Sequence, residues 1–522
     1  MAAVLDWLSM VAGIMPVTST FYLVFLALVV VVFYALRNAT ARSIWLLVAS
    51  AAFYALLTPR ALIVVVALAA FAYAAALVMG PAEPSASGTS ATEGARRRGR
   101  RLALFVSVIA TVGALVYFKA GEYLLGLIAS IPAGANLVGT SPALALAMPV
   151  GVSFWTFQLV AYLVDVYRGT AVPVRSPLKM VLAVLFFPIV TIGPITKVDD
   201  LATQFSQVRR FDFERMRSAL LLMGWGFFKK LVIADRLAVF VGSVYGNVET
   251  FSGSKHGLIF TVATVFYAIQ LYADFSGYTD IVRASARLMG IELPHNFAAP
   301  YLSRSVSEFW RRWHMTLMDW LKRYVYIPLG GNRKGPLRKQ LNILTVFAVS
   351  GLWHGPGLTF LIWGLLNGAY SVVGEALAPL NRRVTDALRI DRESAVHRAF
   401  QRLTTFGLVT FAWVFFRAQS LHDAVWVAAR MFIPTIWIFS DGTMLEQGLS
   451  QTELEIALVA VIALFVVDYL RFERNVNVSG WLTSQHVAFR WLVYYALIML
   501  VVVFGYYGGS GTDASAFVYF RF

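Results

Sequence analysis

The amino-acid sequence predicts an all-α, polytopic membrane protein with about 10–12 spanning helices. Hydrophobic residues make up 59% of the chain and charged residues 14%, whereas a soluble domain has about 25% charged residues. Many apolar runs approach the roughly 20 residues that cross a hydrocarbon core. The clearest runs are 21–36, 61–79, 102–118, 258–271, 456–470 and 491–504. They are almost continuously apolar, which favours helices over the alternating strands of a β-barrel.

The first apolar segment is expected to remain as a helix, because Asp6 lies where a cleavable signal peptide would carry basic residues. The chain has no cysteine, which excludes disulfide bonds, thiolate nucleophiles and thiolate metal sites. Its seven histidines lack the close spacing of metal ligands, so no metal is expected.

The basic residues concentrate in short connections between apolar runs, at residues 37–42, 93–101 and 167–179. Under the positive-inside rule these connections face the cytoplasm. Counting helices back from residues 93–101 places the N-terminus outside, and the loop 121–141, also expected outside, carries only Glu122 as a charge. Membrane topology therefore accounts for most of the net charge of +16, which argues against nucleic acid as a partner.

We expect a single membrane-embedded domain over residues 1–522. In residues 1–120 we expect uninterrupted hydrophobic helices and a flexible cytoplasmic linker at 80–101. In residues 402–522 we again expect uninterrupted spanning helices. Between them, from 144 to 375, Gly, Pro and charged residues interrupt the apolar segments. Broken helices within a membrane occur only inside protein or along a water-filled cavity, so the catalytic core is expected in this central part.

A polar and aromatic segment at 303–339 contains the first histidine of interest, His314. As a helix from about Ser305 it is amphipathic and basic, which fits an interfacial helix on the cytoplasmic surface. Under that interpretation His314 is one more interfacial polar residue. A functional role for His314 remains open at this point.

His354 lies in the apolar stretch "FAVSGLWHGPGLTFLIWG". It follows the basic residue Lys339 by 15 residues, a helical climb of about 22 Å that places the imidazole deep in the bilayer. The Gly-Pro-Gly sequence at 355–357 then breaks the helix. Burial disfavours the charged imidazolium, so a neutral ring able to accept a proton from a hydroxyl is expected. The alternative is a core histidine hydrogen-bonded to a neighbouring helix.

Two carboxylates, Asp274 and Asp280, follow an apolar helix and predict either a proton or cation site or structural ion pairs. Pairing with Arg283 or Arg287 is the favoured interpretation, because charges within a membrane usually find partners. A second charged run is expected to mark a membrane interface: Lys229, Lys230, Asp235 and Arg236.

Several reaction classes lack their motifs. The sequence has no GxxxxGK[ST] phosphate loop, no HExxH zinc helix and no GxSxG elbow. Without cysteine, a thioester intermediate on the enzyme is impossible. Acyl transfer by general base catalysis stays open.

Three stretches carry a specific resemblance: "QLYADFSGYTD", "FWRRWH" and "SGLWHGPG", with the two Trp-His pairs forty residues apart. Over about residues 145–420 the chain resembles the membrane-bound O-acyltransferase (MBOAT) family. It is most similar to the bacterial branch that contains alginate O-acetyltransferase membrane subunits and D-alanyl transfer proteins of teichoic acids. The resemblance implies a ring of helices around a central tunnel that connects the two faces of the bacterial inner membrane, with a periplasmic N-terminus.

By this resemblance, the family's invariant histidine falls on His354 and its second histidine on His314. His354 would act as general base on a hydroxyl offered from the outer side, or relay the acyl group, while His314 would orient the donor. A cytoplasmic acyl thioester, acetyl-CoA or an acylated carrier protein, would be the donor, and no cofactor is expected. The tunnel or donor-binding candidates are Trp353, Trp313, Arg311, Asp274, Ser276 and Asn296.

The predicted function is O-acetylation of an exported, alginate-like polysaccharide, completed by a periplasmic acetyltransferase or export partner. Departures from the family pattern at His295, Arg323 and Leu341 leave the donor and the polysaccharide open. The alternatives are transfer of D-alanyl or another acyl group from a carrier protein to a cell-envelope acceptor, acylation of a lipid or protein, and a transporter. A transporter often shows inverted repeats, and none is visible in the sequence.

Overall fold

The structure is a computed structural model that describes residues 17–80, 90–129, 148–251 and 257–507. All regular elements in these ranges are helices. The expectations for Asp6 and for most of the loop 121–141 fall outside the described residues.

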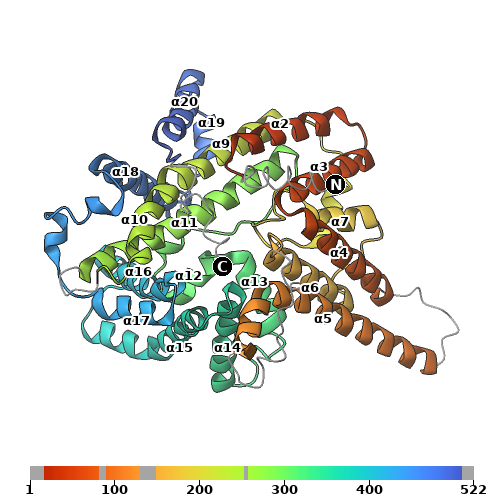
Figure 1. Cartoon of the computed structure of the whole chain (residues 1–522), viewed down its shortest axis with the longest axis horizontal. Coiled ribbons are helices and arrows are strands. Elements are labelled where there is room, and N and C mark those ends of the chain that lie inside the picture. The colour runs from red at the N-terminus through yellow and green to blue at the C-terminus, as the bar shows by residue number, and fades with distance from the viewer. Residues whose placement is uncertain (1–16, 81–89, 130–147, 252–256, 508–522) are drawn as a thin grey trace. The chain divides into compact units, whose positions relative to one another are not determined.

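Seven helices of the described part are long and apolar enough to cross a membrane. They are α3 (Ala39–Leu57), α4 (Pro59–Met79), Arg96–Gly121 within α5 (Ser90–Ala129), α11 (Gly257–Leu288), α15 (Leu358–Ala387), α16 (Ala395–Arg417) and α20 (Val487–Phe504) (Figure 1). A shorter apolar helix, α2 (Thr20–Ala35), precedes them. The chain is therefore a multi-pass helical membrane protein, as predicted. The total of about 10–12 spans stays a prediction.

Contacts within the chain group it into two compact units. The first, called the N-terminal unit here, comprises Met1–Leu220 and Val282–Pro294, and the second, the C-terminal unit, comprises Leu221–Ile281 and His295–Phe522. Helix α9 (Phe213–Phe227) and helix α11 each contribute to both. The single-domain organisation stays a prediction.

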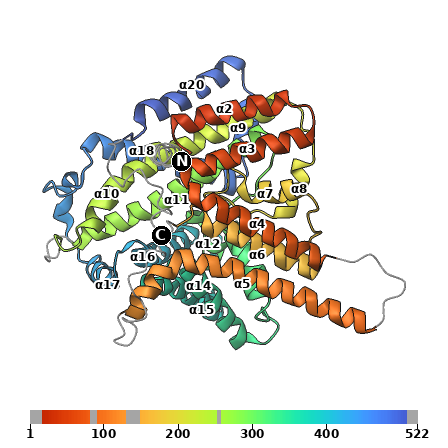
Figure 2. The same cartoon turned by 45° about the vertical axis from the view of Figure 1, so that its right-hand side comes forward.

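The first two described helices of the N-terminal unit begin at polar capping residues. Ser19 and Asn38 accept hydrogen bonds from backbone N–H groups in the first turns of α2 and α3, which satisfies donors that helix starts leave unpaired. Helices α4, α5 and α6 (Val152–Arg168) pack side by side (Figure 2). Two short helices follow, α7 (Pro177–Leu185) and α8 (Val198–Phe205).

The basic connections of the N-terminal unit are tied to one another by hydrogen bonds. Arg100 donates to the backbone oxygen of Tyr167 at 3.0 Å, and Lys179 donates to Ser206 at 2.6 Å. Arg42 donates to the backbone oxygen of Arg209. Connections 93–101 and 167–179 are thus bonded to each other, and connections 37–42 and 167–179 both bond to the segment 206–209, as expected if they share a membrane face. Their cytoplasmic assignment stays a prediction.

The linker predicted at 80–101 is shorter in the structure than the sequence suggested. Helix α5 begins at Ser90, so the basic stretch 93–101 is helical. Its Ala, Glu and Arg residues are strong helix formers that extend the spanning helix past its apolar part.

The C-terminal unit contains the remaining helices. After a π-helical segment, η2 (Phe228–Ala234), they are α10 (Asp235–Gly246), α12 (Val306–Arg312), α13 (Met315–Leu321), α14 (Pro336–His354), α15, α16, α17 (Leu421–Arg430), α18 (Gln451–Asp468), α19 (Val478–Thr483) and α20. Helices α14 and α15 form an extensively packed pair (Figure 1).

Glycines let α14 and α15 touch through their backbones. A Cβ on Gly364 of α15 would lie 2.2 Å from the backbone oxygen of Phe347, and one on Gly351 of α14 would lie 2.3 Å from that of Phe360. Small residues permit such close approach between membrane helices. This contact fixes the end of α14, where His354 is the last residue.

Buried ion pairs join η2 to α11. Lys229 pairs with Asp280 at 2.7 Å, and Lys230 pairs with Asp235 at 2.7 Å and Asp274 at 2.8 Å. The structural-pair interpretation of the two α11 carboxylates is therefore confirmed, with lysines as partners.

The expected interface position of Lys229 and Lys230 is wrong, because these residues are 4% and 3% exposed. The π-helical segment adds a residue to the turn and shifts which side chains face inward. The close approach of Gly226 and Gly277 brings their helices together, since a Cβ on Gly277 would lie 2.8 Å from the oxygen of Gly226.

Candidate active site

His354 is enclosed by aromatic rings in the C-terminal unit and is 3% exposed. Its ring centroid lies 4.7 Å from that of Trp353, 5.1 Å from Trp363 and 5.1 Å from Phe416. Such an apolar shell would solvate an imidazolium poorly, so it favours the neutral ring. The sequence interpretation of His354 as a buried neutral base fits this environment.

Three helices supply this shell, and local sequence explains how. Gly355 ends α14, and the ring of Phe360 occupies the space that a Cβ on Gly355 would need. One turn further along α15, Trp363 points to the same side and stacks on Trp413 of α16, with centroids 5.4 Å apart. The i, i+3 spacing places the side chains of each helix on one face.

His314 lies between α12 and α13 in a left-handed backbone conformation, with φ 43°. For a residue other than glycine this conformation is uncommon, and it is often found at functional sites. Two backbone hydrogen bonds hold it in place. Ala298 N–H donates to Arg312 O at 3.0 Å, and Met315 N–H donates to Asn296 O at 2.9 Å.

The interfacial-helix interpretation of this segment is wrong. The chain breaks at Trp313 and His314 instead of continuing as one helix from Ser305. His314 is 1% exposed, and Trp310 and Trp313 are also buried. Periodicity alone suggested one amphipathic helix because the break residues fit the same pattern of polar and aromatic side chains.

Asn296 determines which ring nitrogen of His314 carries the proton. The amide Oδ1 of Asn296 accepts from the backbone N–H of Thr316 at 3.3 Å and from its hydroxyl at 2.9 Å. His314 Nδ1 lies 3.1 Å from the same oxygen. Because this oxygen only accepts, Nδ1 carries the hydrogen in the neutral ring, and Nε2 keeps its lone pair.

Trp353 connects the two histidines. Its ring centroid lies 6.0 Å from that of His314 and 4.7 Å from that of His354. Phe275 of α11 closes the other side of His314 at 4.9 Å. The structure thus joins two residues forty positions apart into one buried cluster, which we call the histidine cluster: His314, His354, Trp353, Trp363, Phe416, Phe275 and Asn296.

The six residues predicted to bind the donor or line a tunnel lie in different places in the C-terminal unit. Trp353 and Asn296 belong to the histidine cluster, and Trp313 packs against Trp413 with centroids 5.2 Å apart. Asp274 and Ser276 belong to the buried charge network, where Ser276 accepts from Lys229 at 3.0 Å. Arg311 is exposed on α12. The roles of all six in donor binding or in a tunnel stay predictions.

Sequence reasoning missed Trp363, Phe416 and Phe275 as neighbours of the histidines. Trp363 and Phe416 each lie in an apolar helix that looked like ordinary membrane span. The available signal was the i, i+3 spacing of Phe360 with Trp363 and of Trp413 with Phe416.

Two buried hydrogen-bond donors lie in the histidine cluster. The indole N–H of Trp363 and the amide Nδ2 of Asn296 have no hydrogen-bond partner among the described residues. Orphaned buried donors are costly and call for an explanation. Groups of this kind stabilise oxygen atoms that gain negative charge during acyl transfer.

The described chain is thus a helical multi-pass membrane protein with a buried pair of histidines. Residues 169–416 match the sequence model of the MBOAT, membrane-bound O-acyltransferase family. This range holds both histidines and most of the helices that surround them. The chain belongs to the membrane-bound O-acyltransferase family, and it is an O-acyltransferase.

The names of its relatives refer to three different substrates: alginate, peptidoglycan and teichoic acid. The chain is 31% identical to a probable alginate O-acetylase AlgI of Pseudomonas putida over 442 residues, 82% of this chain and 86% of the relative. It is 32% identical to a peptidoglycan O-acetyltransferase of Helicobacter pylori over 423 residues, 76% and 74% of the two chains. A teichoic acid D-alanyltransferase of Streptococcus thermophilus matches at 27% over 244 residues, 44% and 57% of the chains.

The burial of His314 predicts a specific pH dependence of stability. Burial lowers the pKa of His314 from 6.5 to about 3. The unfolded chain therefore binds a proton at His314 below about pH 6.5, whereas the folded chain binds it only below about pH 3. The free energy of unfolding consequently decreases as the pH falls through this window. Thermal unfolding of the purified protein between pH 7.5 and 5 should show a shallower decline in His314→Gln than in the unchanged protein.

An exposed imidazole provides the control for this measurement. The side chain of His422 is 75% exposed, so His422→Gln is measured in parallel as the variant that removes an imidazole from the surface. Parallel profiles for His314→Gln and the unchanged protein would show that His314 is not held neutral by burial.

Proposed function

We propose that this O-acyltransferase moves acetyl groups from cytoplasmic acetyl-CoA to a hydroxyl of an exported polysaccharide. The buried histidine pair joined by Trp353 carries the proposal, because it offers a neutral base in an apolar site. The naming of several relatives as alginate O-acetylases supports the acetyl group and the sugar acceptor. The enzyme would act in a bacterial inner membrane, with its N-terminus in the periplasm.

In the proposed reaction, His354 removes the proton from the acceptor hydroxyl as its oxygen attacks the thioester carbonyl. The carbonyl oxygen gains negative charge, and the N–H groups of Trp363 and Asn296 are suited to stabilise it. The C–S bond then breaks, and the thiolate takes the proton held by His354. The products are an acetyl ester and CoA, and no group remains on the enzyme.

The lone pair on Nε2 of His314 suits this residue to orient the donor by accepting a hydrogen bond. Both histidines are almost fully buried, so substrates must reach them along a tunnel or by displacing rings of the cluster. Movement of Trp363 or Phe416 would expose His354 to an approaching acyl group. The central tunnel stays a prediction.

A second candidate donor is an acylated carrier protein. The match to teichoic acid D-alanyltransferases favours it, although these relatives are less similar and cover about half of this chain. The basic segment 333–339 would suit either a carrier-protein surface or the phosphates of CoA.

The donor can be tested with purified enzyme in lipid nanodiscs. We expect radiolabelled acetyl-CoA to label an uronic-acid oligosaccharide and to release free CoA in equal amount. Acetyl-CoA and a D-alanyl carrier protein should be supplied in separate reactions. Label transfer from the carrier protein alone would overturn the acetyl-CoA assignment, while CoA release without acceptor labelling would overturn the sugar acceptor.

A further inference from the structure

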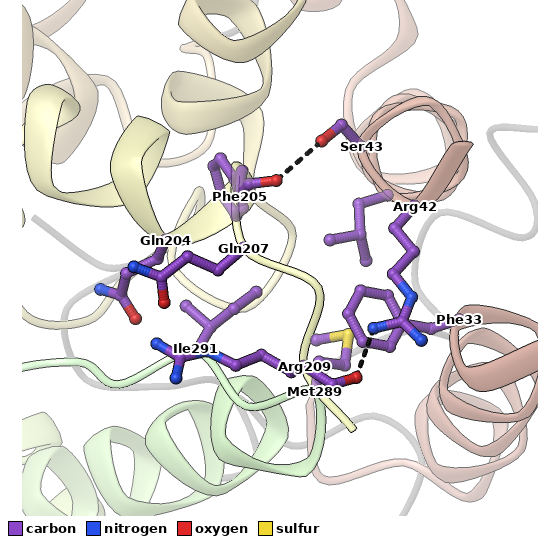
Figure 3. A pocket seen from close by; sticks show the side chains of 10 residues that line it. Phe33, Arg42, Ser43, Gln204, Phe205, Gln207, Arg209, Met289 and Ile291 are labelled. Atoms are coloured by element: carbon purple, nitrogen blue, oxygen red, sulfur yellow. Dashed lines mark hydrogen bonds between the residues drawn. The ribbon is translucent and has the colours of Figure 1, made fainter. Parts of the chain in front are cut away.

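A shallow hollow, open to solvent, lies in the N-terminal unit, between the start of α3, the end of α8 and the segment that follows α11 (Figure 3). It is separate from the histidine cluster in sequence and shares no residue with it. One part of its lining is apolar and the other part is polar; the lining includes Phe33, Leu46, Ile291, Arg42, Arg209 and Gln207. Such a lining suits an amphiphilic ligand.

Arg42 is held rigidly at the edge of this hollow. It is 6% exposed, donates through Nε to the oxygen of Leu36 at 2.9 Å, and donates through Nη1 to the oxygen of Arg209. Its guanidinium stacks 4.6 Å from the ring centroid of Phe33. Because Arg42 lies in the first turn of the apolar helix α3, this fixed charge sits at the level of the membrane surface.

Two further guanidinium groups, those of Arg209 and Arg215, lie beside the hollow. Gly290, with φ 75°, allows both to approach, since a Cβ there would lie 2.9 Å from Arg209 Cγ and 3.5 Å from Arg215 Cζ. The Nε atoms of Arg209 and Arg215 are buried and have no hydrogen-bond partner among the described residues. Buried donors of this kind are suited to oxygen atoms of a ligand.

Two of the nearby carboxylates form ion pairs with other arginines. Glu292 pairs with Arg287 at 2.9 Å, and Glu214 pairs with Arg217. Asp212 accepts from the backbone N–H at the start of α9 at 2.9 Å. Gln204 makes two hydrogen bonds with the backbone of Glu292, which fixes the wall of the hollow. The wall of the hollow is therefore held by hydrogen bonds, and its lining and surroundings are rich in arginine.

We propose that this hollow binds the phosphate-bearing headgroup of an anionic membrane phospholipid. The phosphate would accept from Arg209 and Arg215 beside Arg42, and the start of an acyl chain would lie against Phe33 and Leu46. Basic pockets between membrane helices are suited to such headgroups, and Arg matches phosphate with paired donors. The proposal is independent of the acyl donor and of the acceptor.

The test measures phospholipid binding to the full-length protein in detergent, by native mass spectrometry and by the shift in unfolding temperature. Phosphatidylglycerol should bind and raise the unfolding temperature, and phosphatidylcholine should not. Arg209→Gln should weaken phosphatidylglycerol binding about fivefold, the effect of about one basic side chain at a membrane surface. Gln207→Glu, which adds a charge at the exposed rim, should weaken it similarly.

Arg37→Gln is the matched control, because Arg37 is exposed on the same connection and does not line the hollow. It should retain lipid binding, and all three variants should unfold at an unchanged temperature without lipid. If Arg37→Gln weakened phosphatidylglycerol binding as much as Arg209→Gln, general surface charge would explain the effect, and the proposed site would be excluded. A second contrary outcome is that inorganic phosphate raises the unfolding temperature as much as phosphatidylglycerol does, with the effect lost in Arg209→Gln. That result would show a site for soluble phosphate and would exclude a lipid as its ligand.

Discussion

Acyl transfer by His354→Ala is expected to fall about 10²–10⁴-fold, the usual contribution of a positioned general base. The neutral imidazole is enclosed by Trp353, Trp363 and Phe416, so water entering the space of the lost ring is a poor substitute for it. The measurement is the initial rate of labelled acetyl ester formation by enzyme in nanodiscs, at saturating donor. The expected change lies in kcat, since the base acts on the reacting hydroxyl.

A matched control separates chemistry from folding. His422→Ala removes an exposed imidazole and should keep full activity. The amount of His354→Ala in the membrane and its unfolding temperature should be measured in parallel. A folded His354→Ala protein that retains more than about a tenth of the rate would exclude general base catalysis by this residue.

The sequence predicted the helical membrane class well because apolar length is a local property. The continuous apolar run 61–79 is long enough by itself to predict a spanning helix, and the structure has helix α4 at Pro59–Met79. The end of a helix at His354 was also predicted from a local signal, the Gly-Pro-Gly that follows. The structure ends α14 at that residue.

The surroundings of His354 could not be predicted, because they come from pairing between helices. Gly351 and Gly364 bring α14 and α15 into backbone contact, which places Trp363 against the ring, and Phe416 of α16 packs against both. A hydropathy pattern gives no information on which faces of two apolar helices will meet.

Lys229 and Lys230 show a second limit, which is helical phase. Their charges suggested a membrane interface, but a π-helical segment turns both toward the carboxylates of α11. The sequence alone does not distinguish a buried charge, whose desolvation cost is offset by an ion pair, from a charge that is exposed to water. Similarly, the break at Trp313 and His314 depends on backbone pairing with residues 296–298.

Gly364→Ala is expected to reduce both stability and acyl transfer severely, because the added methyl group would collide with the backbone of α14. Its Cβ would lie 2.2 Å from the oxygen of Phe347 on α14, a distance that forces the helices apart. Overpacking of a well-packed contact costs about 1–3 kcal/mol or more, and no flexible side chain can yield here. Because His354 ends α14, the shift would also move the imidazole relative to Trp363.

Gly374→Ala on the same helix is the control, since a Cβ there meets nothing within 4 Å. Alanine favours a helix over glycine by about 1 kcal/mol, so this variant should keep its activity and its unfolding temperature. The two variants differ only in whether the added methyl group faces α14. If Gly364→Ala keeps the rate and stability of Gly374→Ala, the glycine contact does not position His354, and the aromatic rings must hold the imidazole without it.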